Sequence, residues 1–314
     1  MNAKISRALI LAVAMTSLIS ACGKKASIGS SDRAAPGVQT PSLSDEVATW
    51  RAKRLSRLKA DDGWLTLAGL YWLEEGNNRV GTEPGSEVLL PKGVKSAGVL
   101  LRKGREVRFK PATNSQVTVN DQPAVSMALI SDKNGEPTML RIGPVSFYLI
   151  ERGDRIGVRV KDTESESRKN FQGIEMFPVD PKWNVEATFE PYNPPKEIPI
   201  LNIIGIVETM RSPGVLKFSI DGKQLSIDPV IEEGSDELFL IFKDATSGRS
   251  TYGAGRYLYA SMPKSGNKVM LNFNKAYNPP CAFTPFATCP LPPLQNRLSI
   301  EIPAGEKNFA GGPH

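Results

Sequence analysis

Apolar residues recur along this chain with two different periods, first that of a helix and then that of a β-strand. The first is helical and covers residues 43–59. Its apolar positions, which fall on one helical face, are Leu43, Val47, Trp50 and Leu58. Ser42 precedes the segment and Asp45 follows three residues later, a pair typical of a helix N-terminus. The pattern predicts one amphipathic helix from Leu43 to Lys59, which ends at Asp61-Asp62-Gly63.

After Gly63 apolar and polar residues alternate, which is the period of a β-strand. Clusters of turn residues separate these short runs, and such regular spacing favours a sandwich or a barrel. The strands expected in this part are 64–73, 99–101, 106–109, 116–119, 125–129, 145–151 and 155–160. The last two form a predicted hairpin around Gly153-Asp154.

A polar stretch at residues 161–173 marks a join between two β domains. The strands expected after it are 185–189, 198–210, 215–220, 225–227, 237–242, 256–261, 268–273 and 298–302. Asp221-Gly222 is predicted as a two-residue hairpin turn, because glycine supplies the positive φ that such a turn needs. The sequence therefore predicts an all-β fold with one short amphipathic helix before two β-sandwich or barrel-like domains. The expected division is helix 43–60, first domain 61–162, second domain 163–306 and a frayed tail 307–314.

Residues 1–21 have the composition of a targeting segment. Lys4 and Arg7 precede an apolar run too short to span a bilayer. The residues Leu18-Ile-Ser-Ala-Cys22 resemble the bacterial lipobox, which implies cleavage before Cys22 and stable membrane anchoring by acyl chains on that residue. Gly23-Lys24 looks like outer-membrane sorting, and residues 22–42 read as a flexible tether. The expected location is the periplasmic face of the outer membrane; the alternative is a plain secretory signal with an incidental cysteine.

Charge and histidine content narrow the possible functions. Of the formal net charge of +6, +4 lies before residue 43, so the remaining +2 gives no electrostatic footprint for nucleic acid. The single histidine is His314, the last residue. Ser-His-Asp and Cys-His catalysis and most zinc sites are therefore not expected. We expect no cofactor and no metal, and any catalysis would rest on carboxylates, Tyr, Lys or a thiolate.

Part of the first β domain resembles the forkhead-associated β-sandwich. The resemblance rests on "NNRVGTEPGSEVLLP", "VLLRKGREVRFKP" and "QVTVNDQPAV" within residues 76–125. It implies a β-sandwich there. Thr82 stands after Gly81, where that family has its phosphopeptide-reading arginine, so the resemblance does not extend to phosphothreonine binding.

The C-terminal half is similar to an uncharacterised bacterial family catalogued as domain of unknown function 1684. The similarity covers roughly residues 150–307. It rests on "KDATSGRSTYGAGRYL" and on "LNFNKAYNPPCAFTPFATCPLPPLQNRLSIEIPAGEK". It implies that the two are related, but it implies no particular activity.

A long proline-rich loop is predicted between residues 272 and 306. Six prolines between Pro279 and Pro293 exclude a helix there, and the aromatic residues among them favour an ordered loop. Cys281 and Cys289 lie in this loop. Outside the cytoplasm, this spacing predicts a disulfide, and the alternative is a pair of free buried thiols.

A ligand site is predicted where the glycine-rich turn before Arg256 lies near the end of the next strand. Backbone donors and the Arg256 guanidinium could bind an anion. The candidate residues, which would ring a pocket for an anionic or hydroxyl-rich small ligand, are Arg256, Tyr257, Asn274, Tyr277 and Asn278. The alternative is that Arg256 pairs with Asp244 and only holds the hairpin.

One acidic cluster is the candidate for acid–base chemistry. Its members are Asp228, Glu232, Glu233, Asp236 and Glu237. So many acids in one turn favour a solvated loop, and the spacing is not that of a calcium loop. The function predicted is a binding or envelope-interaction module, and the alternative is a His-independent hydrolase that uses carboxylates or tyrosine.

Overall fold

The computed structural model of the chain describes residues 41–312. It is mostly β, with one long helix before several sheets, so the predicted all-β class is confirmed. The predicted signal segment, Cys22, the predicted tether up to residue 40 and residues 313–314 lie outside the described residues. Within 41–312, none of the helices has both the length and the apolar character needed to cross a membrane.

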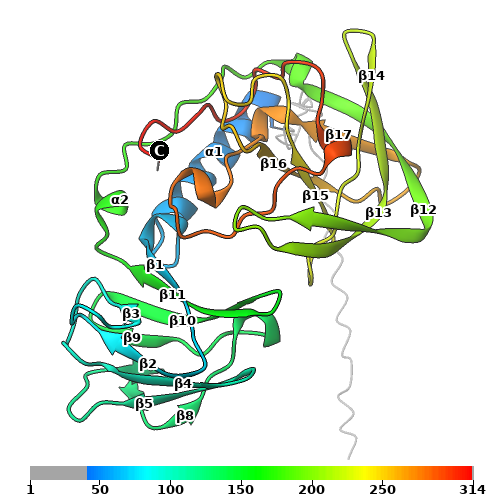
Figure 1. The fold of residues 1–314 in the computed structure, drawn as a ribbon. Helices are drawn as coiled ribbons and strands as arrows, with labels where there is room; N and C mark the ends of the chain where they lie inside the picture. Colours follow the sequence, from blue (N-terminus) through cyan, green and yellow to red (C-terminus); the bar gives the residue numbers. More distant parts are fainter. Residues whose placement is uncertain (1–40, 313–314) are drawn as a thin grey trace, which may run out of the picture. The chain divides into compact units, whose positions relative to one another are not determined.

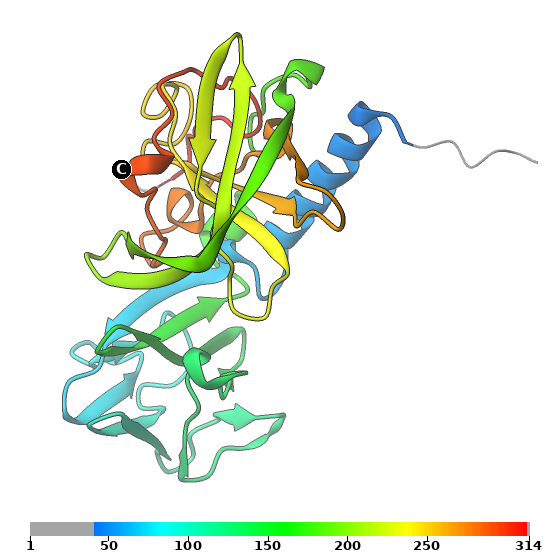
Figure 2. The same cartoon turned by 90° about the vertical axis from the view of Figure 1, so that its right-hand side faces the viewer.

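The predicted helix is present as α1, Leu43–Lys59. Ser42 Oγ accepts from the Asp45 backbone N–H at 3.2 Å, and the Asp45 carboxylate accepts in return from Ser42, which completes a capping box. Val47 and Leu58 are buried. Figures 1 and 2 show α1 alongside the segment that follows β17, Lys268–Asn272. The local signals therefore define this helix correctly.

Two sheets and one core account for the strands up to residue 162 (Figure 1). The six-stranded sheet has the order β1 (Leu67–Trp72), β11 (Arg155–Asp162), β10 (Val145–Arg152), β9 (Leu140–Ile142), β6 (Thr118–Val119) and β7 (Gln122–Pro123). The five-stranded sheet has the order β3 (Val88–Leu89), β2 (Gly76–Gly81), β4 (Gly98–Lys103), β5 (Glu106–Pro111) and β8 (Met127–Ala128). Phe109 and Phe147 meet in their common core with ring centroids 6.1 Å apart. The predicted β10–β11 hairpin is confirmed.

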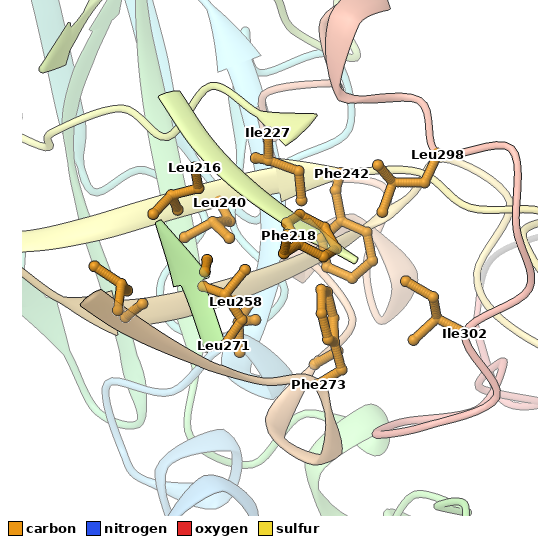
Figure 3. Close-up of a cluster of buried hydrophobic side chains, with 14 of the residues drawn as sticks. Leu216, Phe218, Ile227, Leu240, Phe242, Leu258, Leu271, Phe273, Leu298 and Ile302 are labelled. Atoms are coloured by element: carbon orange, nitrogen blue, oxygen red, sulfur yellow. The ribbon is translucent and has the colours of Figure 1, made fainter. Parts of the chain in front are cut away.

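A second set of sheets follows residue 184. One has the order β14 (Lys223–Ile227), β13 (Val207–Ile220), β12 (Asn184–Leu201) and β17, and a separate pair is β15 (Glu237–Phe242) with β16 (Arg256–Ser261). Short helical segments complete the chain: α2 (Glu166–Lys169) and six 3-10 turns at Trp64–Thr66, Asp132–Asn134, Pro181–Trp183, Phe273–Lys275, Pro280–Ala282 and Leu294–Asn296. Figure 3 shows the core that the sheets enclose, where Phe242 contacts Phe273 with centroids 5.6 Å apart. Asp221 and Gly222 have φ of 49° and 77°, which confirms the predicted turn between β13 and β14.

The predicted strand over residues 198–210 is wrong. The chain turns back at residues 202–206, so this run is split between β12 and β13. The Asn202 side-chain oxygen accepts from the N–H groups of Ile204 and Ile206, and Gly205 adopts φ of 82°. A side chain that satisfies the backbone of its own loop allows a turn inside an apolar run.

Two expectations for the C-terminal end also need correction. Residues 298–302 form no regular strand; Leu298 instead donates its N–H to the Lys243 carbonyl at 2.7 Å. The predicted fraying does not begin at residue 307. Phe309 is partly buried and contacts the rings of Phe171 and Phe283, with centroids 5.8 Å and 4.9 Å away. These contacts hold the chain up to Phe309 in place, and residues 310 and 311 are exposed.

Candidate functional site

Arg256 lies inside the protein and does not reach a ligand. Its side chain has no exposed surface, and its guanidinium contacts the Asp244 carboxylate at 3.3 Å. It also donates to the Ile302 carbonyl at 2.8 Å and to the Ala304 carbonyl. The prediction that Arg256 binds a ligand is therefore wrong, and the alternative pairing with Asp244 is confirmed.

The residue before Arg256 must be glycine, which accounts for one of the glycines in this turn. Gly255 has φ of 110°, and a Cβ there would lie 2.6 Å from the Phe242 carbonyl oxygen. Only glycine adopts this conformation so close to another backbone. This glycine thus allows β16 to start against β15 with Arg256 directed inward.

Asn274 and Asn278 are also buried supports. The Asn274 amide exchanges two hydrogen bonds with the backbone of Asp180, both 3.0 Å long. Asn278 donates its backbone N–H to Glu306 at 2.7 Å and its side-chain N–H to the Lys307 carbonyl at 2.8 Å. Both amides are used to hold chain segments together, so the structure corrects their predicted role in ligand contact.

Tyr257 and Tyr277 are the two predicted site residues that the structure does bring to one cleft. Their backbones exchange two hydrogen bonds of 2.9 Å, and their rings meet edge to face at 5.8 Å. Tyr257 is nearly fully buried and donates its hydroxyl to the Pro290 carbonyl. Tyr277 is half-buried. These two backbone hydrogen bonds place the buried Tyr257 ring and the more accessible Tyr277 ring on the same side of the cleft.

The cleft beside these tyrosines has a volume of about 1790 Å³. Six aromatic residues line it: Trp64, which lies apart from the others in the sequence of the first sheets, and five from α1, β15, β16 and the segment after β17, namely Trp50, Phe239, Tyr257, Tyr259 and Tyr277. Tyr259 stacks on Phe239 at 4.8 Å and lies nearly parallel to Tyr277 at 6.2 Å. The Trp50 ring lies 6.1 Å from Tyr277. These rings form a continuous aromatic wall.

Arg54 of α1 covers this wall, and the sequence analysis did not identify it. Its guanidinium carbon lies 4.6 Å from the centre of the Tyr277 ring. Its Nε donates to Glu306 at 2.9 Å, and an Nη donates to the Asn278 carbonyl at 2.8 Å. Arg54 occupies a position in the apolar stripe of the helix, between Val47 and Leu58. A charged residue on the apolar face of a helix indicates a buried polar partner, and this signal could have identified Arg54.

Three acids of the predicted solvated loop also line the cleft: Glu232, Glu233 and Glu237. Glu232 accepts a short hydrogen bond from the Tyr259 hydroxyl. Burial raises the pKa of both Tyr259 and Tyr277. At neutral pH both phenols therefore stay protonated and act as hydrogen-bond donors.

Cys281 and Cys289 are both free buried thiols, so the predicted disulfide is absent from the structure and the free-thiol alternative holds there. The Cys281 backbone N–H donates to the Cys289 sulfur at 3.0 Å. The Tyr252 hydroxyl donates to the Cys281 carbonyl at 3.1 Å. These bonds and the 3-10 turn at Pro280–Ala282 hold the loop without a covalent link. Burial raises the pKa of the Cys289 thiol, which lowers its reactivity.

This arrangement predicts two inaccessible but reduced thiols. Iodoacetamide should leave the peptides that carry Cys281 and Cys289 unmodified in the native protein. After unfolding in guanidinium without a reductant, both should be alkylated, because no bond protects them. Peptide mass spectrometry measures the modified fraction. Alkylation that requires prior reduction would instead demonstrate a disulfide.

Within the described part of the chain, no three His, Cys, Asp or Glu side chains converge to hold a metal ion. Two charged groups of the cleft have fixed partners: Arg54 pairs with Glu306, and Glu232 accepts from Tyr259. The arrangement suits the binding of a ligand by stacking faces and fixed polar groups.

Comparisons with known proteins give a family match over part of the chain and a similar solved structure. Residues 169–307 match the family described as "Protein of unknown function (DUF1684)", which confirms the predicted kinship over this range. Among solved structures, the chain is similar to the solution NMR structure of an uncharacterised protein from Haloarcula marismortui. That protein is 31% identical, the match covers 45% of this chain and 78% of that chain, and the TM-score is 0.38. No curated protein matches the chain.

Proposed function

We propose that this protein, whose residues 169–307 belong to the DUF1684 family, binds an extended, hydroxyl-rich ligand in the cleft beside α1. The observation that carries the proposal is the aromatic wall of Tyr259 and Tyr277, which stands next to polar groups held in place by buried partners. Ligand sites combine such apolar surfaces with a few fixed hydrogen-bonding groups.

The size of the cleft favours an extended ligand. A single small molecule is bound in roughly 300–1,000 Å³, and this cleft measures about 1790 Å³. An oligosaccharide of several units fits such a space. Sugar rings present both apolar faces and hydroxyls, which complement tyrosine rings and their O–H groups.

The rigidity of the wall supports binding. Arg54 is held by Glu306, which is fully buried, and Tyr259 is held by Glu232. A preformed site loses less conformational entropy when the ligand binds. Burial raises the pKa of Tyr259 and Tyr277, which favours their use as hydrogen-bonding groups over their use as a base in the hydrolase alternative.

Chitotetraose, cellotetraose and maltotetraose are suitable probes for isothermal titration calorimetry and for Trp fluorescence. At least one should bind the wild type. Tyr259→Ala and Tyr277→Ala should each weaken that binding at least tenfold, which corresponds to about 1.4 kcal/mol. Both variants lose a stacking surface. Tyr277→Ala also loses a hydroxyl donor, and Tyr259→Ala loses a hydroxyl oxygen that can accept while its hydrogen bonds Glu232.

Tyr192→Ala is the matched control. Tyr192 is also a half-buried tyrosine whose hydroxyl bonds to a carboxylate, that of Asp228 at 2.8 Å, but it does not line the cleft. Its affinity should equal that of the wild type. No heat and no fluorescence change with any of the three sugars, or equal losses in Tyr192→Ala and Tyr259→Ala, would refute the proposal.

The proposed location is the periplasmic face of the outer membrane, with the chain anchored through a lipidated Cys22. This proposal is supported by the lipobox-like residues before Cys22 and the basic Lys4 and Arg7 at the start. A binding module on a tether can reach ligands close to the membrane surface.

Cys22→Ser should abolish incorporation of radiolabelled palmitate and leave the chain unprocessed or released. The serine hydroxyl cannot replace the thiol as the acceptor of the lipid. Labelling is measured on the immunoprecipitated full-length chain, with Cys281→Ser as the control, which should label normally. Undiminished label in Cys22→Ser would exclude the anchor.

A further inference from the structure

The cleft contains a second group of charged residues, on β10, β11 and the proline-rich loop. Arg159 and Arg152 both donate to one hydroxyl, that of Thr288, at 3.3 Å and 3.1 Å. All three residues line the cleft. Two guanidinium groups that share one neutral acceptor bring two positive charges close together.

Arg159 is the residue of this group without a counter-ion. It is only 4% exposed, and no carboxylate of residues 41–312 lies within salt-bridge distance of it. Its Nε has no hydrogen-bond partner in the described chain, and Thr288 is the acceptor of its single side-chain hydrogen bond there. A buried charge is costly to desolvate unless it is paired.

The two acids that come from β10 and the turn before it are already used. Asp132 pairs with Arg152 at 2.9 Å, and Glu151 pairs with Arg105 and accepts from Ser131. Three arginines therefore face two carboxylates, which leaves the charge of Arg159 in excess. The Trp64 ring, 5.5 Å from the Arg159 guanidinium, compensates for it only by a cation–π contact.

The strand period explains why an arginine occurs here. Val158 and Val160 of β11 point into the core of the first two sheets, so Arg159 lies on the opposite face. Lys161, two residues on, lies on the same face. Burial lowers its pKa; the charge of Asp62 opposes this shift and the smaller effect of Arg159 adds to it. The face thus carries two basic side chains.

We infer that Arg159, Arg152 and Thr288 form a subsite for an oxyanion, the carboxylate or phosphate group of the ligand that enters the cleft. The free edge of the Arg159 guanidinium offers the planar fork that oxyanions bind in bidentate fashion. The Thr288 hydroxyl accepts from both arginines, so its own hydrogen is available to donate to the same anion. The inference shares its cleft with the proposed function and names an acidic substituent on the ligand.

The test uses the full chain and simple anions. Sodium phosphate, sodium sulfate and sodium acetate are titrated against sodium chloride at equal ionic strength, with thermal unfolding as one readout and calorimetry as the other. The wild type should show a saturable rise in Tm with at least one oxyanion and none with chloride. The stronger of the phosphate and acetate responses identifies the kind of oxyanion.

Arg159→Met should weaken oxyanion binding at least tenfold, because it removes the charge and keeps the length of the side chain. Thr288→Val should weaken it at least threefold and provides a second variant should Arg159→Met fail to fold. Arg79→Met is the control, since Arg79 is exposed and paired with Glu87. It should bind like the wild type.

An unchanged Tm of the wild type in all three oxyanions would overturn the inference and assign Arg159 a structural role beside Trp64. Oxyanion binding that survives in both Arg159→Met and Thr288→Val would overturn it as well. The proposed function is tested separately. If phosphate binds through Arg159 but no oligosaccharide binds, this inference stands and the hydroxyl-rich ligand is refuted; if oligosaccharides bind without any oxyanion response, the reverse holds.

Discussion

Asp244→Ala will lower the free energy of unfolding by about 3–5 kcal/mol, the cost of breaking a buried ion pair by removing one partner. Both side chains of the Asp244–Arg256 pair are fully buried. The carboxylate also accepts from the Ile302 backbone N–H at 2.7 Å and from the Thr246 hydroxyl at 2.8 Å. The substitution therefore leaves one charge and two donors without their partner. Urea unfolding followed by circular dichroism measures the change.

Glu186→Ala is the control for this experiment. Glu186 pairs with Lys268 at 2.8 Å, but both side chains are more than half exposed, so the loss should be about 0–1 kcal/mol. In a double-mutant cycle, Asp244→Ala and Arg256→Met should be coupled by at least about 1 kcal/mol. Equal losses for Glu186→Ala and Asp244→Ala would contradict the buried-pair interpretation.

Glu306→Ala will lower the free energy of unfolding by roughly 3 kcal/mol, the lower end of the range for a broken buried pair. Glu306 is fully buried and accepts from Arg54 at 2.9 Å and from the Asn278 N–H at 2.7 Å. Arg54 is 13% exposed, so water can partly solvate it after the change. Hydrogen exchange should also show reduced protection of α1, because Arg54 connects that helix to the loop.

Glu301→Ala is the comparison that isolates burial. Glu301 lies five residues earlier and pairs with Arg249, and both of their side chains are more than half exposed. We expect a loss below about 1 kcal/mol and unchanged protection of α1. If Glu306→Ala unfolds at the same urea concentration as the wild type, the Arg54–Glu306 pair does not stabilise the helix.

Local signals predicted the elements that depend on a few neighbouring residues. The capping pair of Ser42 and Asp45 defined the start of α1, and Asp221-Gly222 defined the β13–β14 turn, because both structures are determined within four residues. The turn at residues 202–206 was missed. Its cause is the Asn202 side chain, which a period of apolar residues does not reveal.

Site residues were predicted correctly only where they lie on segments that follow one another in the sequence and pair in the sheet. Tyr257 and Tyr277 were found because adjacent antiparallel segments bring them together. Arg256 was misassigned, since burial depends on the Ile302 and Ala304 carbonyls from a distant segment. Arg54 could not be placed for the same reason: its partner is 252 residues away. Polarity alone does not distinguish a buried arginine from one in a cleft.

The separation between Arg54 and Glu306 has a consequence for biosynthesis. The helix is made early, yet its buried ion pair needs a carboxylate that the ribosome adds 252 residues later. Until then Arg54 lacks the carboxylate that neutralises it, and an isolated helix of 17 residues is marginal in water. The ion pair that holds α1 therefore forms only when synthesis is nearly complete, and a chain truncated before Glu306 would lack it.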